Sequence, residues 1–261
     1  MFVPERRSSD VVREMSAAHR VYPDGVCAHS RGSGELSEMR SESYNAHGLR
    51  ELPRGCLSAM IVLVSGATGY PRDADVGHLV VPKQWNDPAT LDLQPGRWAM
   101  DNGAFSGFDA GAFVRMLEAY APYRGELFVT APDVVADAAA TRALWPFWSL
   151  LIRGIGRAPA FVAQDGLSPE QVPWTELGAL FIGGSTAYKE SADVRTLCGI
   201  AKSKGIWVHW GRVNGKRRYE LALKSGCDSI DGTGFSMFPD TNIPKIADWE
   251  RQIQEQPELL L

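Results

Sequence analysis

Residues that can do chemistry stand directly after short apolar runs in this sequence. Three of these runs lead into an aspartate, one into a glutamine, one into a glycine pair and one into a histidine: Asp101, Asp133, Asp231, Gln164, Gly183, Gly184 and His209. Two facing carboxylates suit displacement at a glycosidic carbon, because one can attack C1′ to form a covalent intermediate while the other moves protons on the leaving group. The sequence therefore indicates chemistry at a glycosidic bond.

The other groups of this set suit the recognition of a purine edge. A third carboxylate can accept hydrogen bonds from the N1–H and 2-amino groups of guanine. A glycine N–H and a glutamine amide can donate toward O6 or N7 of the same base. Together these groups specify guanine better than adenine.

Each residue also has a simpler structural interpretation. An aspartate after a strand often caps the next helix, and Asp133 fits this alternative best, since Asp101 and Asp231 are each followed by glycine within two residues. The glycine pair can serve only as a tight turn. Gln164 precedes Asp-Gly and fits a turn, and a lone histidine such as His209 fits a hydrogen-bonded residue of the core.

The elements that must position these residues alternate regularly. Short β-branched or aromatic runs predict strands at residues 61–65, 98–100, 127–131, 160–163, 179–182, 206–209 and 228–230, and amphipathic patterns predict helices at 110–120, 137–151, 190–203 and 216–224. Apolar strands alternating with helices are typical of an α/β protein whose parallel sheet is covered on both faces. We expect a compact TIM-type (β/α)8 barrel, in which the strand ends converge on one mouth. A doubly wound sheet is the alternative.

Composition sets the outer limits of this interpretation. The 261 residues are 44% hydrophobic and 22% charged, which excludes collagen, coiled coil and full-length disorder. No run of 18 apolar residues occurs, so we expect no membrane span and a cytoplasmic location. The four cysteines stand singly, so we expect no metal site.

Residues 1–59 differ from the rest of the chain. They hold nine Ser and eight Arg but no Lys or Trp, and they show little periodicity. Such a segment cannot bury enough apolar surface to offset its ordering entropy. We therefore expect a flexible, disordered N-terminal arm over residues 1–59 and a barrel domain over residues 60–261.

The formal net charge of −4 conceals one basic segment. Residues 189–224 hold nine Lys or Arg residues against three acids, a local charge of +6. An acidic protein with such a segment can present it to a polyanion. A pair of solvated helix faces is the simpler alternative.

The motifs DNGAF, PDVV, AFVAQDG, LFIGGS and GCDSIDG occur in this order at barrel-strand spacing. The series resembles the tRNA-guanine transglycosylase superfamily over residues 61–238. The phrases FIGGST, HWGRVNGKRR and DSIDGT are most similar to its DpdA-like branch, the DNA-guanine transglycosylases of phages and bacteria, which place 7-deazaguanine bases in DNA. The resemblance implies a transferase that exchanges guanine in DNA for a 7-deazaguanine co-substrate, without a cofactor.

The resemblance also implies a role for each matching residue. The nucleophile falls on Asp231, with Asp228 as the competing candidate, and the general acid/base falls on Asp101. Base recognition falls on Asp133, Gln164, Gly183 and Gly184, with Phe105 stacking on the base. Within the basic segment we expect phosphate contacts from Arg212, Lys216, Arg217 and Arg218.

The departures from the family pattern bear on the acceptor. The tRNA enzymes carry a zinc site, CxCxxC with a histidine, after the nucleophile, whereas no cysteine follows Cys227 here. We therefore expect DNA, with tRNA or a free guanine nucleotide as alternative acceptors. A non-catalytic DNA-binding barrel and an unrelated enzyme acting on a sugar phosphate are further alternatives. The sequence leaves open whether accessory proteins or a second copy of the chain take part.

Overall fold

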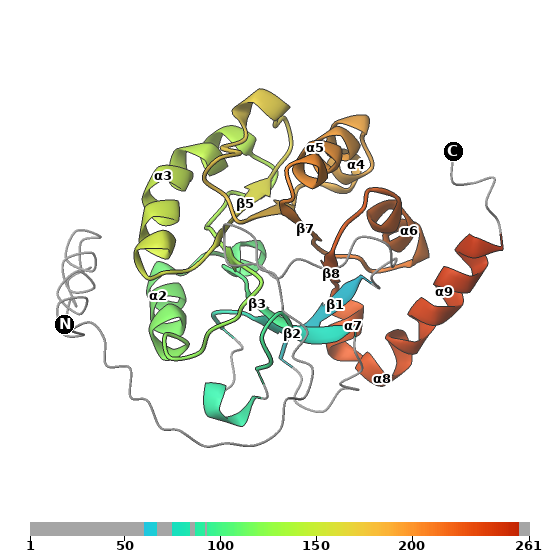
Figure 1. The fold of residues 1–261 in the computed structure, drawn as a ribbon, viewed down its shortest axis with the longest axis horizontal. Coiled ribbons are helices and arrows are strands. Elements are labelled where there is room, and N and C mark those ends of the chain that lie inside the picture. The colour runs from blue at the N-terminus through green and yellow to red at the C-terminus, as the bar shows by residue number, and fades with distance from the viewer. Residues whose placement is uncertain (1–59, 67–74, 84–86, 92, 256–261) are drawn as a thin grey trace, which may run out of the picture. The chain divides into compact units, whose positions relative to one another are not determined.

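The computed structural model describes residues 60–66, 75–83, 87–91 and 93–255, so the predicted arm lies outside the described residues. Eight parallel strands follow one another around a closed barrel, and helices surround them (Figure 1). The strands are β1 (Ile61–Val64), β2 (Val76–Val80), β3 (Trp98–Met100), β4 (Val129–Thr130), β5 (Pro159–Ala163), β6 (Ala179–Ile182), β7 (Trp207–Trp210) and β8 (Ser229–Asp231). The closed barrel confirms the predicted (β/α)8 architecture and excludes the doubly wound sheet.

The barrel closes through β1 and β8, where Leu63 lies opposite Asp231 in the parallel register. Strand β2 is the one that the sequence pattern did not predict, because its segment VGHLV carries a glycine, which weakens a strand pattern. The glycine is needed here. A Cβ on Gly77 would lie 2.1 Å from the carbonyl oxygen of Arg97 at the start of β3. The close approach of β3 therefore requires glycine at position 77, and this same glycine obscures the strand pattern of β2 in the sequence.

The helices that cover the barrel begin where polar caps are available. Asp109 caps α2 (Ala110–Ala119), Asp137 caps α3 (Ala138–Gly154) and Ser191 caps α5 (Ala192–Ser203) through side-chain oxygens that accept from helix N–H groups. These three helices and α6 (Lys216–Lys224) agree with the predicted ranges to within a few residues. The remaining helices are α4 (Thr186–Lys189), α7 (Thr233–Met237), α8 (Pro239–Asn242) and α9 (Pro244–Gln254), with short 3-10 turns at Pro88–Thr90, Ala104–Ser106 and Pro169–Gln171.

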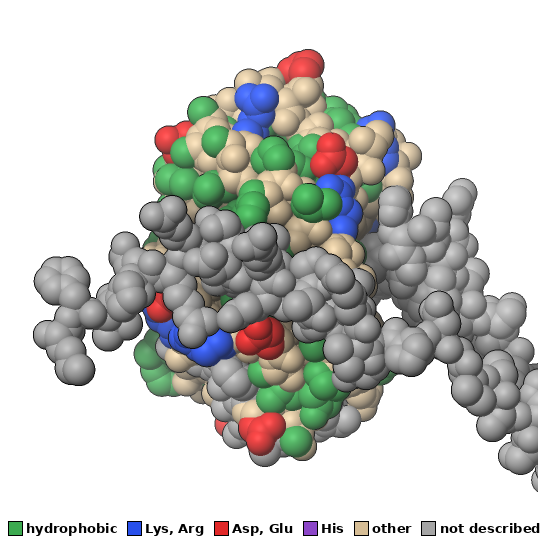
Figure 2. Space-filling model, turned by 90° about the vertical axis from the view of Figure 1, so that its left-hand side faces the viewer, with side chains coloured by type: hydrophobic (Ala, Val, Ile, Leu, Met, Phe, Trp, Pro, Cys, Tyr) green, Lys and Arg blue, Asp and Glu red, His purple; other side chains and the backbone are tan. Residues whose placement is uncertain are grey.

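On the face that carries α2 and α3, basic and acidic side chains lie among hydrophobic ones, so the described residues there present no single sign of charge (Figure 2). None of the described helices combines the length and the apolar character that a membrane span requires. Cys198 and Cys227 are buried free thiols, and the described residues hold no group of three or more metal-binding side chains.

A buried ion pair ties α3 to the segment that precedes β4. Arg157, just after α3, lies 2.7 Å from the Glu126 carboxylate, and neither side chain is more than 7% exposed. The same guanidinium donates to the carbonyl oxygens of Tyr120 and Tyr123 and stacks on the Trp98 ring. Removing the cation would leave a buried carboxylate and two carbonyls without their donor, which is costly.

We predict that Arg157→Met lowers the free energy of unfolding by about 3–5 kcal/mol, because breaking a buried pair strands its partner. Arg153→Met is the matched control, since its Glu176 pair is exposed, with side chains 38% and 47% accessible. That variant should lose less than about 1 kcal/mol. Denaturant unfolding of the three proteins measures the difference, and equal losses would contradict the prediction.

Candidate active site

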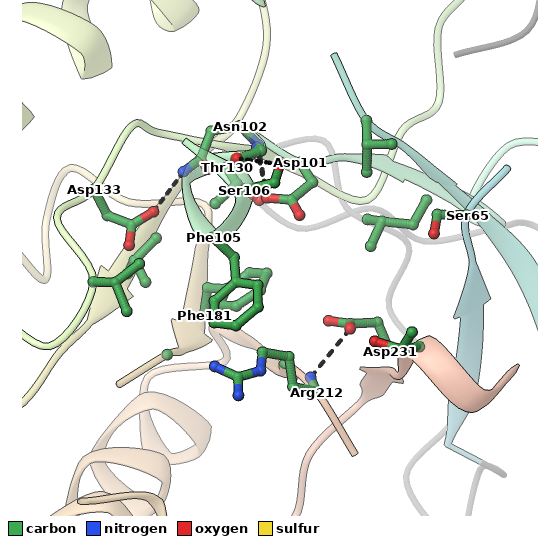
Figure 3. Close-up of a pocket in the computed structure, with 18 of the residues that line it drawn as sticks. Ser65, Asp101, Asn102, Phe105, Ser106, Thr130, Asp133, Phe181, Arg212 and Asp231 are labelled. Atoms are coloured by element: carbon green, nitrogen blue, oxygen red, sulfur yellow. Dashed lines mark hydrogen bonds between the residues drawn. The ribbon is translucent and has the colours of Figure 1, made fainter. Parts of the chain in front are cut away.

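A cavity of about 690 Å³ opens at the carboxyl ends of the barrel strands. It is lined by eight of the residues predicted from sequence: Asp101, Phe105, Asp133, Gln164, Gly183, Gly184, Arg212 and Asp231. Figure 3 shows the three aspartates facing this space from different strands. The structure therefore brings the predicted reacting and recognition residues together.

Asp231, the last residue of β8, is held by donors from the neighbouring strand β7. Its Oδ1 accepts from the Arg212 N–H at 3.1 Å, and its Oδ2 lies 2.9 Å from His209 Nε2. The competing candidate, Asp228, precedes β8 and therefore lies at the opposite end of the barrel. There it pairs with Lys202 and accepts from the Val208 N–H. Of the two carboxylates, only Asp231 lines the cavity.

His209 belongs to a buried polar chain beneath Asp231. Trp207 Nε1 donates to Ser229 Oγ, and that hydroxyl lies 2.9 Å from His209 Nδ1. An ionised Asp231 carboxylate can only accept, so His209 Nε2–H donates to it, and in the neutral imidazole Nδ1 then accepts from the Ser229 hydroxyl. The histidine is fully buried and packs against the Phe128 and Phe181 rings. It is thus a core histidine, as the simpler interpretation held, and it also orients the candidate nucleophile.

Asp133 is oriented by two amides from neighbouring strand ends. Asn102 Nδ2 donates to its Oδ1 at 2.7 Å, and Gln164 Nε2 donates to its Oδ2 at 2.5 Å. Burial raises the pKa of Asp133, and the two amide donors oppose that rise. The carboxylate caps no helix, since α3 begins later with Asp137 as its cap. The capping interpretation of Asp133 is therefore wrong.

Asp101 follows β3 and receives hydrogen bonds from backbone groups. The Asn102 N–H donates to its Oδ1 at 2.7 Å, and the Gly103 N–H lies at 3.5 Å from the same oxygen. Burial, followed by the negative charges of Asp231 and Asp133, raises the pKa of Asp101 to about 7. The carboxyl group therefore exchanges its proton near neutral pH, as a general acid/base must.

The glycine pair after β6 corrects one expectation. The Gly183 N–H donates to the Ala163 carbonyl at 3.0 Å, so it is engaged within the barrel and does not serve as a free donor to a base. A Cβ on Gly183 would lie 2.7 Å from Gln164 Nε2. Gly184 has a φ of +81°, and its Cβ would lie 2.5 Å from Asp165 Oδ2. Both glycines are therefore required by close packing.

Gln164 also differs from its expected role as a donor toward the base. Its Nε2 is bonded to Asp133, and its Oε1 accepts from the Ala136 N–H at 2.8 Å. The side chain is 2% exposed. It lines the cavity, but these contacts make it chiefly a positioning residue for Asp133.

Phe105 and Arg212 meet across the mouth of the cavity. The Arg212 guanidinium carbon lies 3.9 Å from the centre of the Phe105 ring, a cation–π contact between the loops after β3 and β7 (Figure 3). The Phe105 ring is exposed and so remains available to stack on a ligand.

The other three basic residues predicted to contact phosphate do not line the cavity. Lys216 donates to Gln252, Arg217 pairs with Glu190, and Arg218 donates to the Arg212 carbonyl oxygen and to Thr186. Arg218 therefore supports the loop that carries Arg212. Phosphate contacts by Lys216 and Arg217 stay a prediction.

Sequence reasoning missed two residues of the site. Asn102 bridges two loops, because its Nδ2 also donates to the Ala131 carbonyl at 2.7 Å. Lys189, at the end of α4, lines the cavity although only 3% of the residue is exposed. Asn102 lies in the motif DNGAF and Lys189 begins the basic segment, but neither pattern assigns them to the site, since each gains its contacts only when distant loops fold together.

Two non-glycine residues in the described chain have a positive φ, Ala136 at 63° and Arg212 at 62°. Each uses its backbone N–H to hold a side chain of the site, Gln164 and Asp231 respectively. A left-handed conformation costs such residues about 1 kcal/mol or more. Backbone strain is thus located where the site side chains are held.

No model of a known protein family matches the chain, and a search of curated proteins finds no relative. The resemblance to the transglycosylase superfamily therefore stays a prediction carried by the motifs themselves.

We predict that Asp101→Asn stabilises the protein more at pH 8.5 than at pH 4.5. The raised pKa means that the folded state holds the Asp101 proton more tightly than the unfolded state, so wild-type stability falls as pH rises toward and through 7. Asn cannot ionise, and the variant should gain about 1–3 kcal/mol relative to wild type at the higher pH.

Urea unfolding at the two pH values measures this gain. Asp137→Asn, at the exposed cap of α3, is the matched control because Asn caps equally well. A pH-independent gain for Asp101→Asn would contradict the prediction.

Proposed function

We propose that this protein is a glycosyltransferase that replaces guanine in DNA with a 7-deazaguanine derivative through a glycosyl–aspartate intermediate. The observation that carries the proposal is the unlike pair of carboxyl groups on one cavity. Asp101 has a pKa of about 7, whereas Asp231 is held by His209 and the Arg212 N–H. One group can give a proton while the other attacks.

The reaction proceeds in two displacements. The target guanine leaves the stack and enters the cavity, at a cost of a few kcal/mol in stacking and pairing. Asp231 attacks C1′ and the bond to guanine breaks, while Asp101 protonates the departing base. The incoming deazapurine then attacks the same carbon, Asp101 takes its N9 proton, and Asp231 leaves. Two inversions retain the configuration at C1′.

The contacts of Asp133 support recognition of a guanine edge. Its oxygens are fixed by Asn102 and Gln164, so their remaining lone pairs can accept from the N1–H and 2-amino groups of the base. Phe105 offers an exposed ring at the mouth for stacking. Gln164 and the glycine pair shape this part of the cavity.

The proposal includes the setting of the reaction. DNA is the favoured acceptor because the chain lacks the zinc motif of the tRNA enzymes, and a bacterial or phage-infected cytoplasm is where the protein would meet it. Arg212 lines the cavity and would contact the strand in this proposal, so its removal should weaken binding of every sequence alike.

We predict that the wild-type protein forms a covalent adduct with guanine-containing duplex DNA when no incoming base is supplied. Asp231→Ala should abolish the adduct on denaturing gels, because the carboxylate that attacks C1′ is removed. Asp228→Asn, at the opposite end of the same strand, should retain it. Loss of the adduct only in the Asp228 variant would exchange the two assignments.

The same assay identifies the acceptor. Release of labelled guanine is followed in parallel from duplex DNA, tRNA and GMP, and DNA should be the preferred substrate. Preference for tRNA or GMP would move the activity to the alternative acceptor. Salt-sensitive DNA binding without guanine release from any of the three would instead indicate a non-catalytic binding barrel.

We predict that adduct formation in a single turnover slows as pH rises above 7. Asp101 must carry a proton to protonate the departing guanine, and its pKa of about 7 sets the fraction that does. Asp101→Asn should slow the step by about 10²–10⁴-fold and remove this pH dependence. A variant that keeps the wild-type pH profile would assign the acid to another group.

A further inference from the structure

Lys189 is a buried cation that the proposed reaction leaves without a role. Its Nζ donates to the Gly211 carbonyl oxygen at 2.5 Å, and no described carboxylate lies within ion-pair distance of it. An ammonium group has three N–H donors, so two of them have no partner among the described residues. The residue lines the cavity, which is where those donors can meet a ligand.

Charged groups of both signs surround Lys189. Arg212 from the loop after β7 and Arg218 from α6 repel its charge, while Asp231 and Asp165 attract it. Burial is the largest influence, and together these effects lower the pKa of Lys189 to about 8. The ammonium form therefore predominates at pH 7, although its surroundings destabilise it. A bound anion would stabilise the ammonium form.

Two cations of the cavity lie on the same side as Asp231. Asp101 and Asp133 lie on one side, whereas Arg212 lies on the other together with Asp231 (Figure 3). Lys189 belongs to the second side, because Gly211 links it to Asp231. Gly211 accepts the Lys189 hydrogen bond, and a Cβ on this glycine would lie 3.4 Å from Asp231 Oδ2. A single residue, Gly211, thus lies between the Lys189 ammonium and the Asp231 carboxylate, which faces C1′ in the proposed reaction.

We propose that Lys189, with Arg212, binds a phosphate group of the nucleotide whose sugar faces Asp231. This inference rests on the proposed function, in which C1′ lies at Asp231. The sugar would span from that carboxylate to the ammonium, while the base points toward Asp133. The phosphate can be a diester within a DNA strand or the monoester of a free nucleotide.

Binding of the intact protein to guanosine, GMP and a short guanine-containing single strand tests the site. Lys189→Met keeps the side-chain length but removes the charge. The substitution should weaken the binding of GMP or of the strand at least tenfold and change the affinity for guanosine by less than about twofold. Tighter binding of GMP than of guanosine would show that the site accepts a phosphate monoester. Tighter binding of the strand alone would show that it requires a phosphate diester. Lys204→Met, an exposed residue of the same basic segment, controls for the change in net charge.

Raising the pH provides a second readout that a merely structural lysine would not change. We compare the wild-type affinity for GMP or the strand with the affinity for guanosine at the same pH. This ratio should fall as pH rises from 7 to 9, because Lys189 loses its proton. Lys189→Met should lack this fall. Inorganic phosphate should raise the Tm of the wild type and not that of the variant.

The outcomes separate the two proposals. Equal binding of guanosine and of the phosphorylated ligands by the wild type overturns the phosphate site and leaves the proposed function standing. If Lys189→Met weakens guanosine binding as much as it weakens binding of the phosphorylated ligands, the phosphate site is overturned as well, because the lysine then shapes the cavity as a whole. Stabilisation by inorganic phosphate, lost in the variant, without any guanosine binding supports the site and overturns guanine as the base.

Discussion

Three carboxyl groups line one cavity, and the cost of burying them close together is the constraint on which the site depends. They cannot all ionise there without compensation. Asp133 receives two amide donors, and Asp231 receives an imidazole and a backbone N–H. Burial, followed by the charges of Asp231 and Asp133, raises the pKa of Asp101 to about 7, and only backbone donors oppose that rise. In the proposed reaction, burial and the distribution of hydrogen-bond donors together distinguish the proton donor from the nucleophile.

The barrel supplies those donors from adjacent strand ends. Asn102 after β3 reaches the loop after β4, and Gln164 after β5 reaches the same loop from the other side. His209 on β7 supports Asp231 on β8. Asp133 and Asp231 are therefore each fixed by groups from neighbouring strands, and a one-residue change of register would turn these side chains to the other face.

The sequence predicted what depends on local pattern and missed what depends on distant contacts. Apolar runs and strand-end polar residues predicted the barrel and its mouth, because parallel strands deliver their ends to one rim. Strand β2 was hidden by Gly77, which a neighbouring carbonyl requires. The engaged N–H of Gly183 and the burial of Lys189 were likewise invisible, since both arise from packing between loops. Charge counted along the chain also placed Lys216 and Arg217 near the site, although both bind partners elsewhere.

The left-handed backbone at Ala136 and Arg212 has an evolutionary consequence. Glycine at either position would relieve local strain, so a chain selected only for thermal robustness would acquire it. Glycine also widens the conformational range of the loop, and the N–H groups that hold Gln164 and Asp231 would then be less firmly aimed. Robustness and function oppose each other at these two positions. We expect a descendant with glycine at both positions to be more stable to heat but to hold Gln164 and Asp231 less precisely.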